Sequence, residues 1–305
     1  MNTIMKRLAI ILVGILLFNM LPVFASPISA QAAADYDIKE VNFVFLHGFN
    51  SNAGSVQPLG DAIFDKLPEY ISSYERDNPG IQIVADTLYR SYVNNVDIET
   101  WASNIASDIN KRFAGKNNLV LIGHSMGGKA ALYAVAHNIG NLAEKVAMVV
   151  TVNSPIKKLS SYYFIGGDTN LGYEGAQLLL SDQGVLNSIA NYDSSEDGLW
   201  VANNKHWLAL VSAESYPLSP QFDATGVDLL PRDMDDSIVP ISCQYSDGAD
   251  AIYYGEYAHS DFKILEEVAD NLADQILRYI FGGNMDFSVL GRAGSFEHKS
   301  DLFPG

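Results

Sequence analysis

The sequence predicts an α/β fold with a mostly parallel sheet of about six strands flanked by helices. Three observations support this class. Short apolar runs bounded by polar residues, which are typical of buried strands, alternate with segments of helical periodicity. The apolar run that ends at residue 122 leads through a glycine-rich turn directly into an alanine-rich segment. A chain of 305 residues can bury one large core, so we expect a single domain from residue 35 to residue 305.

The predicted elements follow one another in the order of a sheet covered on both faces. Strands are expected at residues 41–46, 81–85, 119–122, 146–152, 207–213 and 251–257. Helices are expected at residues 57–67, where Pro68 stops the helix, and at residues 97–113. A third helix is expected in the alanine-rich segment after the glycine-rich turn, and a fourth runs from the last strand to residue 281. The segment 97–113 has the clearest amphipathic pattern, because its large apolar residues recur every three or four positions. This alternation indicates a parallel sheet.

The first 34 residues have the form of a secretory signal peptide. Lys6 and Arg7 precede an apolar run at residues 8–18, and several small residues follow it. The run is shorter than the about 20 residues that a membrane span needs, which favours a cleaved signal over an anchor. We therefore expect a secreted protein. The tail at residues 282–305 is expected to form either an edge strand or a disordered end.

The charge of the chain limits its partners. Without residues 1–34 it has 17 Lys and Arg against 36 Asp and Glu, a net charge of −19, which argues against nucleic acid as a partner. Anionic membranes would repel such a surface, so contact with lipid would be transient and apolar. Cys243 is the single cysteine, which excludes an intrachain disulfide. The composition leaves the oligomeric state open.

The strongest motif is Gly123-His124-Ser125-Met126-Gly127, between the central predicted strand and the helix behind it. A tight strand-to-helix turn strains the backbone of its central residue, and glycines on either side remove Cβ atoms that would collide. Ser125 would thereby be held at the edge of the sheet as a nucleophile. The motif and its strand and helix resemble the α/β-hydrolase family, in particular its lipases and esterases, whose first two strands are absent here.

The resemblance implies where an oxyanion hole would lie. The backbone N–H of Met126 opens the helix and would face negative charge on an attacked carbonyl oxygen. In the family, the loop that follows the first strand supplies the second donor, which places that role on the backbone N–H of Phe49. The side-chain amide of Asn50 is an alternative donor, and a plain strand-to-helix turn is the alternative to either role.

The resemblance also orders the remaining partners as serine, acid and histidine along the chain. Asp236 begins a segment similar to the family's Asp-x-x-Val-Pro pattern and is the expected acid, with Asp235 and Glu214 as alternatives. A calcium site at Asp233 and Asp235 is a further hypothesis, although no complete calcium-loop spacing is present. No metal or organic cofactor is required.

His259 is the expected base. It follows the last predicted strand, whereas His137 and His206 precede the acid and His298 lies in the tail without a strand before it. His124 is expected to support packing at the tight strand-to-helix turn around Ser125, called the elbow below.

The segment at residues 160–205 interrupts the alternation and is expected to form a lid or cap. Its aromatic residues would either line an apolar approach to the site or pack the segment onto the sheet: Tyr162, Tyr163, Phe164, Tyr173 and Tyr192.

We therefore expect a secreted serine hydrolase that cleaves carboxylic esters, of small molecules or lipids, through an acyl-enzyme. The same motif also serves amidases, thioesterases and acyltransferases. A secreted binding protein on an inactive hydrolase scaffold is the alternative from a different class.

Overall fold

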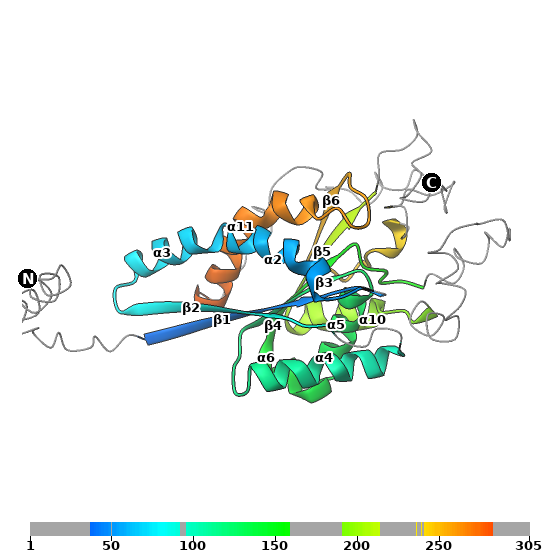
Figure 1. Ribbon diagram of the computed structural model, residues 1–305, viewed down its shortest axis with the longest axis horizontal. Coiled ribbons are helices and arrows are strands. Elements are labelled where there is room, and N and C mark those ends of the chain that lie inside the picture. Colours follow the sequence, from blue (N-terminus) through cyan, green and yellow to red (C-terminus); the bar gives the residue numbers. More distant parts are fainter. Residues whose placement is uncertain are drawn as a thin grey trace, which may run out of the picture. The chain divides into compact units, whose positions relative to one another are not determined.

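The computed structural model describes residues 37–49, 51–91, 96–158, 191–213, 236, 239 and 241–282. Six strands form one sheet in the order β2-β1-β3-β4-β5-β6, and the four pairings from β1 to β6 are parallel (Figure 1). Their bounds are β1 Asp37–Leu46, β2 Ile81–Tyr89, β3 Leu119–His124, β4 Val146–Val152, β5 His206–Ser212 and β6 Ala251–Gly255. The sequence prediction of about six strands, mostly parallel, is confirmed.

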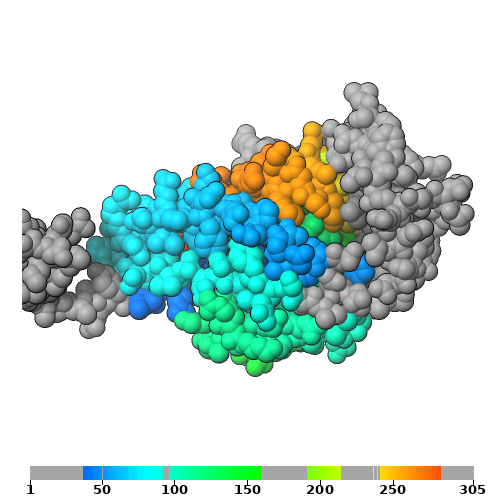
Figure 2. All heavy atoms as spheres, in the orientation of Figure 1, coloured from blue at the N-terminus to red at the C-terminus, as the bar shows by residue number. Residues whose placement is uncertain are grey.

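The helices form two layers, one on each face of the sheet. One layer contains α4, α5, α6 and α10, and the other contains α2, α3 and α11 (Figure 1). The bounds are α2 Gln57–Phe64, α3 Leu67–Asp77, α4 Ile98–Arg112, α5 Met126–Ala136, α6 Leu142–Lys145, α10 Ser195–Asn204 and α11 Lys263–Gly282. Three short 3-10 helices complete the described elements: η1 Ala53–Val56, η2 Ile139–Asn141 and η3 Ile241–Cys243. In the all-atom view α3, in cyan, and α11, in orange, lie side by side (Figure 2).

Each central strand sends alternate side chains into the two helical layers. On β1, Val44 and Leu46 pack with α4 and α5, whereas Phe43 and Phe45 pack with α2 and α11. All six residues of β3 are buried, as expected for a strand covered on both faces. The two apolar cores therefore hold the carboxyl end of β3, which precedes Ser125, at a fixed position.

Local capping explains where the helices begin. Asp97 precedes α4 and accepts a hydrogen bond from the backbone N–H of Thr100 at 2.8 Å, so the expected amphipathic helix begins at Ile98. The prediction of one helix over residues 57–67 is wrong: α2 ends at Phe64, and Pro68 lies in the first turn of α3. Proline is accommodated there because the first helical N–H groups have no partner within the helix.

The order of the strands defines where a ligand would bind. From β1 the chain winds to β2 on one side and then returns to β3 on the other side of β1. Such a switch point leaves a crevice beyond the carboxyl ends of the two diverging strands. Those ends carry His47 and Gly48 after β1 and Ser125 after β3. Within the described ranges, no helix combines the length and the apolar character that crossing a membrane would require.

Candidate active site

Ser125 has a strained backbone between β3 and α5. Its φ is 54° and its ψ is −132°, in a region that residues with a Cβ atom rarely adopt. The conformation is held by the hydrogen bond from the backbone N–H of Ser125 to the carbonyl of Val152 at 2.9 Å. The sharp turn predicted for the motif is therefore present.

Glycine at two positions allows the chain to pack closely around Ser125. A Cβ on Gly123 would lie 2.5 Å from the backbone N and Cα of Gly128. A Cβ on Gly48 would lie 2.7 Å from Cβ of Ser125 and 3.3 Å from its Oγ. The loop after β1 therefore lies directly against the side chain of Ser125.

The two predicted oxyanion donors are each one residue away in the chain from a group at the turn: Met126 follows Ser125, and Phe49 follows Gly48, which packs against Ser125. Met126 is the first residue of α5, so its backbone N–H is one of the four that no helical carbonyl can pair. Phe49 follows Gly48, and its side chain packs against the core between the sheet and α4 and α5. Burial lowers the pKa of His47 in the same loop, which favours the neutral form of this ring. Asn50, the alternative donor, lies outside the described residues.

Asp236 and His259 form a buried pair. The Nδ1 atom of His259 lies 2.7 Å from Oδ2 of Asp236, and the backbone N–H of His259 donates to the carbonyl of Asp236 at 2.7 Å. The second carboxylate oxygen of Asp236 accepts from the backbone N–H of Val239 at 2.7 Å. Both members of the pair are at most 6% exposed, so the pair lies largely out of water.

The alternatives for the acid and the base lie outside the part of the chain that the structure describes. These are Glu214, Asp235 and His298, together with Asp233 of the hypothetical calcium site. Among the described residues, no group of three or more His, Cys, Asp and Glu side chains is arranged to hold a metal ion.

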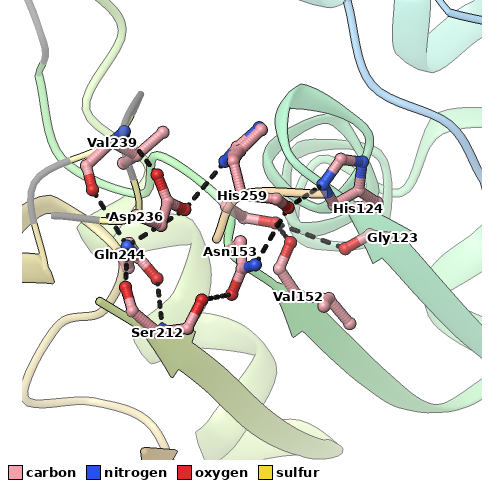
Figure 3. Close-up of polar contacts among 10 residues, drawn as sticks. Gly123, His124, Val152, Asn153, Ser212, Asp236, Val239, Gln244 and His259 are labelled. Carbon is pink, nitrogen blue, oxygen red and sulfur yellow. Dashed lines mark hydrogen bonds and ion pairs between the residues drawn. The ribbon is translucent and has the colours of Figure 1, made fainter. Parts of the chain in front are cut away.

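His124 links the elbow to the buried pair. Its Nε2 lies 2.8 Å from the carbonyl oxygen of His259, and the two imidazole ring centres are 4.8 Å apart (Figure 3). Burial, followed by the nearby His259, lowers the pKa of His124 to about 3. His124 is therefore neutral at pH 7, and because a carbonyl only accepts, its proton is on Nε2. Sequence reasoning assigned packing to this residue but missed its contact with His259, the predicted base.

Three further polar residues surround the pair, and sequence reasoning gave them no role. Asn153, Ser212 and Gln244 are fully buried and connect to one another and to the pair by hydrogen bonds (Figure 3). Asn153 and Ser212 stand at the carboxyl ends of β4 and β5, which is a signal that could have identified them. Gln244 follows η3 and carries no such signal.

The hydrogen bonds of His259 in the described part of the chain involve Asp236, His124 and Asn153, and none reaches Oγ of Ser125. Bonds between a nucleophile and its base are often long before substrate binds and shorten in the complex. The arrangement thus provides a strained serine, a buried imidazole oriented by a carboxylate, and backbone donors at one edge of the sheet.

The segment expected to form a lid is described only at its end. Residues 195–204 form α10, which packs against α5 and β5 and so covers the sheet. Tyr192 contacts Tyr133 of α5 edge to face. The other four aromatic residues, at positions 162, 163, 164 and 173, lie outside the described residues, and for them the lid remains a prediction.

One family model matches part of the chain. The model of the PGAP1-like alpha/beta domain matches residues 86–162, about a quarter of the chain, including β3, the elbow and β4. Together with the sheet described above, this match gives the chain an α/β-hydrolase fold. The matched segment contains Ser125 but ends before Asp236 and His259. No curated protein matches the chain.

Solved structures with a similar fold include two forms of lipase BlEst2 from Bacillus licheniformis. The propeptide form is 15% identical, with 85% of this chain and 52% of that chain covered and a TM-score of 0.49. The mature form is 16% identical, with 81% and 91% covered and a TM-score of 0.46. Phospholipase PlaB from Legionella pneumophila is 13% identical, with 79% and 60% covered and a TM-score of 0.47. The chain thus spans about half the length of the propeptide form.

Proposed function

We propose that the protein is a serine hydrolase that cleaves carboxylic esters through Ser125, His259 and Asp236. The observation that carries the proposal is the buried contact of 2.7 Å between His259 and Asp236 at the sheet edge where the strained Ser125 stands. A serine hydroxyl is too weak an acid to attack an ester unaided, so it needs a base whose tautomer is fixed. The carboxylate at Nδ1 leaves Nε2 of His259 free to accept the serine proton.

The reaction would proceed in two halves. Oγ of Ser125 attacks the ester carbonyl while His259 accepts its proton, and the carbonyl oxygen becomes an oxyanion. The N–H groups of Met126 and Phe49 stabilise this oxyanion, each by about 3 kcal/mol. His259 then protonates the leaving alcohol, and an acyl-enzyme remains. Water, deprotonated by His259, attacks the acyl-enzyme and releases the carboxylic acid and Ser125.

The site and the sequence support different parts of this proposal. The elbow and the buried pair support acyl transfer by serine. The proposals that the protein is secreted and that its substrate is an ester rest on the signal-like residues 1–34 and the apolar segment 160–205. We propose that the substrate is a small-molecule or lipid ester and that contact with a lipid surface is transient. Fold and elbow alone do not select esters over amides or thioesters.

Ester hydrolysis by the secreted protein tests the function. Nitrophenyl esters of rising acyl length should give a burst of nitrophenol followed by steady turnover, and Ser125→Ala should abolish both. Ser195→Ala is the matched control, because Ser195 also stands at the start of a helix but on α10, and it should keep full activity. Retained activity in Ser125→Ala, or cleavage of amides with esters ignored, would overturn the proposal.

A further inference from the structure

Gln244 has a side chain whose orientation its backbone neighbours determine. Its Oε1 accepts from the backbone N–H of Ser212 at 2.9 Å, and its Nε2 donates to the carbonyls of Ser212 at 2.8 Å and Val239 at 3.0 Å. A backbone N–H can only donate and a carbonyl can only accept, so the amide cannot be turned over without losing all three bonds. The NH₂ group of Gln244 is therefore fixed in place.

The same NH₂ group faces the acid. Nε2 of Gln244 also lies 3.3 Å from Oδ2 of Asp236, the oxygen that contacts Nδ1 of His259 at 2.7 Å (Figure 3). With two N–H groups and three acceptors, one N–H is shared between Oδ2 and a carbonyl oxygen. The other oxygen of Asp236 accepts from the backbone N–H of Val239. Because donors contact both oxygens, rotation of the carboxylate would break at least two hydrogen bonds. The contact with Gln244 thus helps to keep Oδ2 within hydrogen-bond distance of Nδ1 of His259.

A second arm of the network reaches His259 from the other side. Oγ of Ser212 donates to Oδ1 of Asn153 at 2.7 Å, and Nδ2 of Asn153 donates to the carbonyl of His259 at 3.0 Å. The bonds from Asp236 through Gln244, Ser212 and Asn153 to His259, together with the Asp236–His259 contact, form a closed ring. This ring connects the acid and the base to the ends of β4 and β5.

We propose that Gln244 is a positioning residue for Asp236 and His259. It contacts the carboxylate oxygen that orients the imidazole and, through Ser212 and Asn153, the backbone of the imidazole's own residue. Apart from His259, which is 6% exposed, the members of the ring are fully buried, where hydrogen bonds are strong and an unpaired polar group is costly. The inference rests on the proposed function, because positioning matters only if the pair assists Ser125.

Gln244 also anchors two backbone segments, so a purely structural role must be distinguished from positioning. Gln244→Met keeps the approximate size and removes every hydrogen bond of the side chain, whereas Gln244→Glu keeps the acceptor for the backbone N–H of Ser212. Thr151→Val is the matched control. It removes a fully buried hydrogen bond of 3.0 Å to Nε1 of Trp207, which is separate from the ring.

The experiment measures kcat and KM on a nitrophenyl ester, with active sites counted by a fluorophosphonate probe, and thermal unfolding of each variant. Positioning predicts that kcat per active site falls about 10- to 100-fold in both Gln244 variants, because small displacements of reacting groups have effects of this size. KM should stay within about 2-fold, since no substrate contact is removed. Thr151→Val should lose thermal stability while keeping kcat.

A proton spectrum gives an independent readout. The downfield resonance of the Nδ1 proton of His259, assigned by its loss in His259→Gln, should shift in both Gln244 variants and stay unchanged in Thr151→Val. Unchanged kcat and an unchanged resonance in a folded Gln244 variant would overturn the proposal. If Gln244→Met fails to fold, Gln244→Glu decides the question. Wild-type protein that takes no probe would refute the serine-hydrolase function, while the resonance would still test the contact of Gln244 with the pair.

Discussion

Replacing His124 with Gln should remove a pH dependence from the stability of the fold. The pKa of His124 falls from 6.5 in the unfolded chain to about 3 in the folded protein, chiefly through burial. A lowered histidine pKa means that stability is complete above pH 6.5 and is lost as the pH falls toward 3, because only the unfolded chain takes up the proton. Between pH 7 and pH 5 the wild-type protein should therefore lose about 2 kcal/mol of unfolding free energy through this residue alone.

His124→Gln is the appropriate variant because its amide can still donate to the carbonyl of His259 but cannot take up a proton. Urea unfolding, followed by tryptophan fluorescence at pH 7 and pH 5, measures the free energy of both proteins. All other titrating groups are shared, so subtracting the two pH dependences isolates His124. The wild type should fall more steeply than the variant by about 2 kcal/mol. Parallel curves would refute the conclusion that His124 is buried and neutral beside His259.

Three further substitutions have clear expected outcomes. Gly48→Ala places a Cβ 2.7 Å from Cβ of Ser125, and should lower ester turnover at least about 100-fold in a folded protein; near-normal turnover would contradict the close packing of this loop. Gly123→Ala sets a Cβ 2.5 Å from the backbone of Gly128 and should reduce the unfolding free energy by about 3 kcal/mol, measured by urea unfolding, whereas a neutral effect would argue against the tight elbow. Burial lowers the pKa of Lys129 to about 7, so at pH 6 the folded state must accommodate a buried ammonium. Lys129→Met should therefore raise the unfolding free energy at pH 6 by about 1 to 3 kcal/mol. A lower urea midpoint of the variant at this pH would contradict the prediction.

Most of the sheet could be predicted because its strands carry their own signal. Fully buried parallel strands are short apolar runs, and all six expected strands are present with boundaries that differ by a few residues. The elbow was predictable in part for a related reason, because the contact that requires Gly123, with Gly128, lies within a few residues. Gly127 depends on a distant segment, since a Cβ there would meet the carbonyl oxygens of Leu46 and His47. The error at Pro68 arose because a proline can follow the end of one helix or stand in the first turn of the next, as Pro68 does in α3.

The surroundings of the Asp236–His259 pair were less predictable because they depend on contacts between distant parts of the chain. Asn153 contacts His259 and Ser212 contacts Gln244, in each case across loops that no local pattern specifies. An amide such as Gln244 has no periodicity and no charge, so nothing in the sequence separates it from a surface glutamine. The pairing of Asp236 with His259 was anticipated from chain order, whereas its burial and its supporting ring required the structure.

The central claim is that Ser125 is a nucleophile activated by His259 and Asp236. Peptide mass mapping after exposure of the protein to a fluorophosphonate probe tests it most directly, since the probe reacts with an activated serine. The account predicts one adduct, on Ser125, that forms at least about 100-fold more slowly in His259→Gln and in Asp236→Asn. No adduct, or labelling that persists unchanged in both variants, would contradict it and favour a binding protein on a hydrolase scaffold.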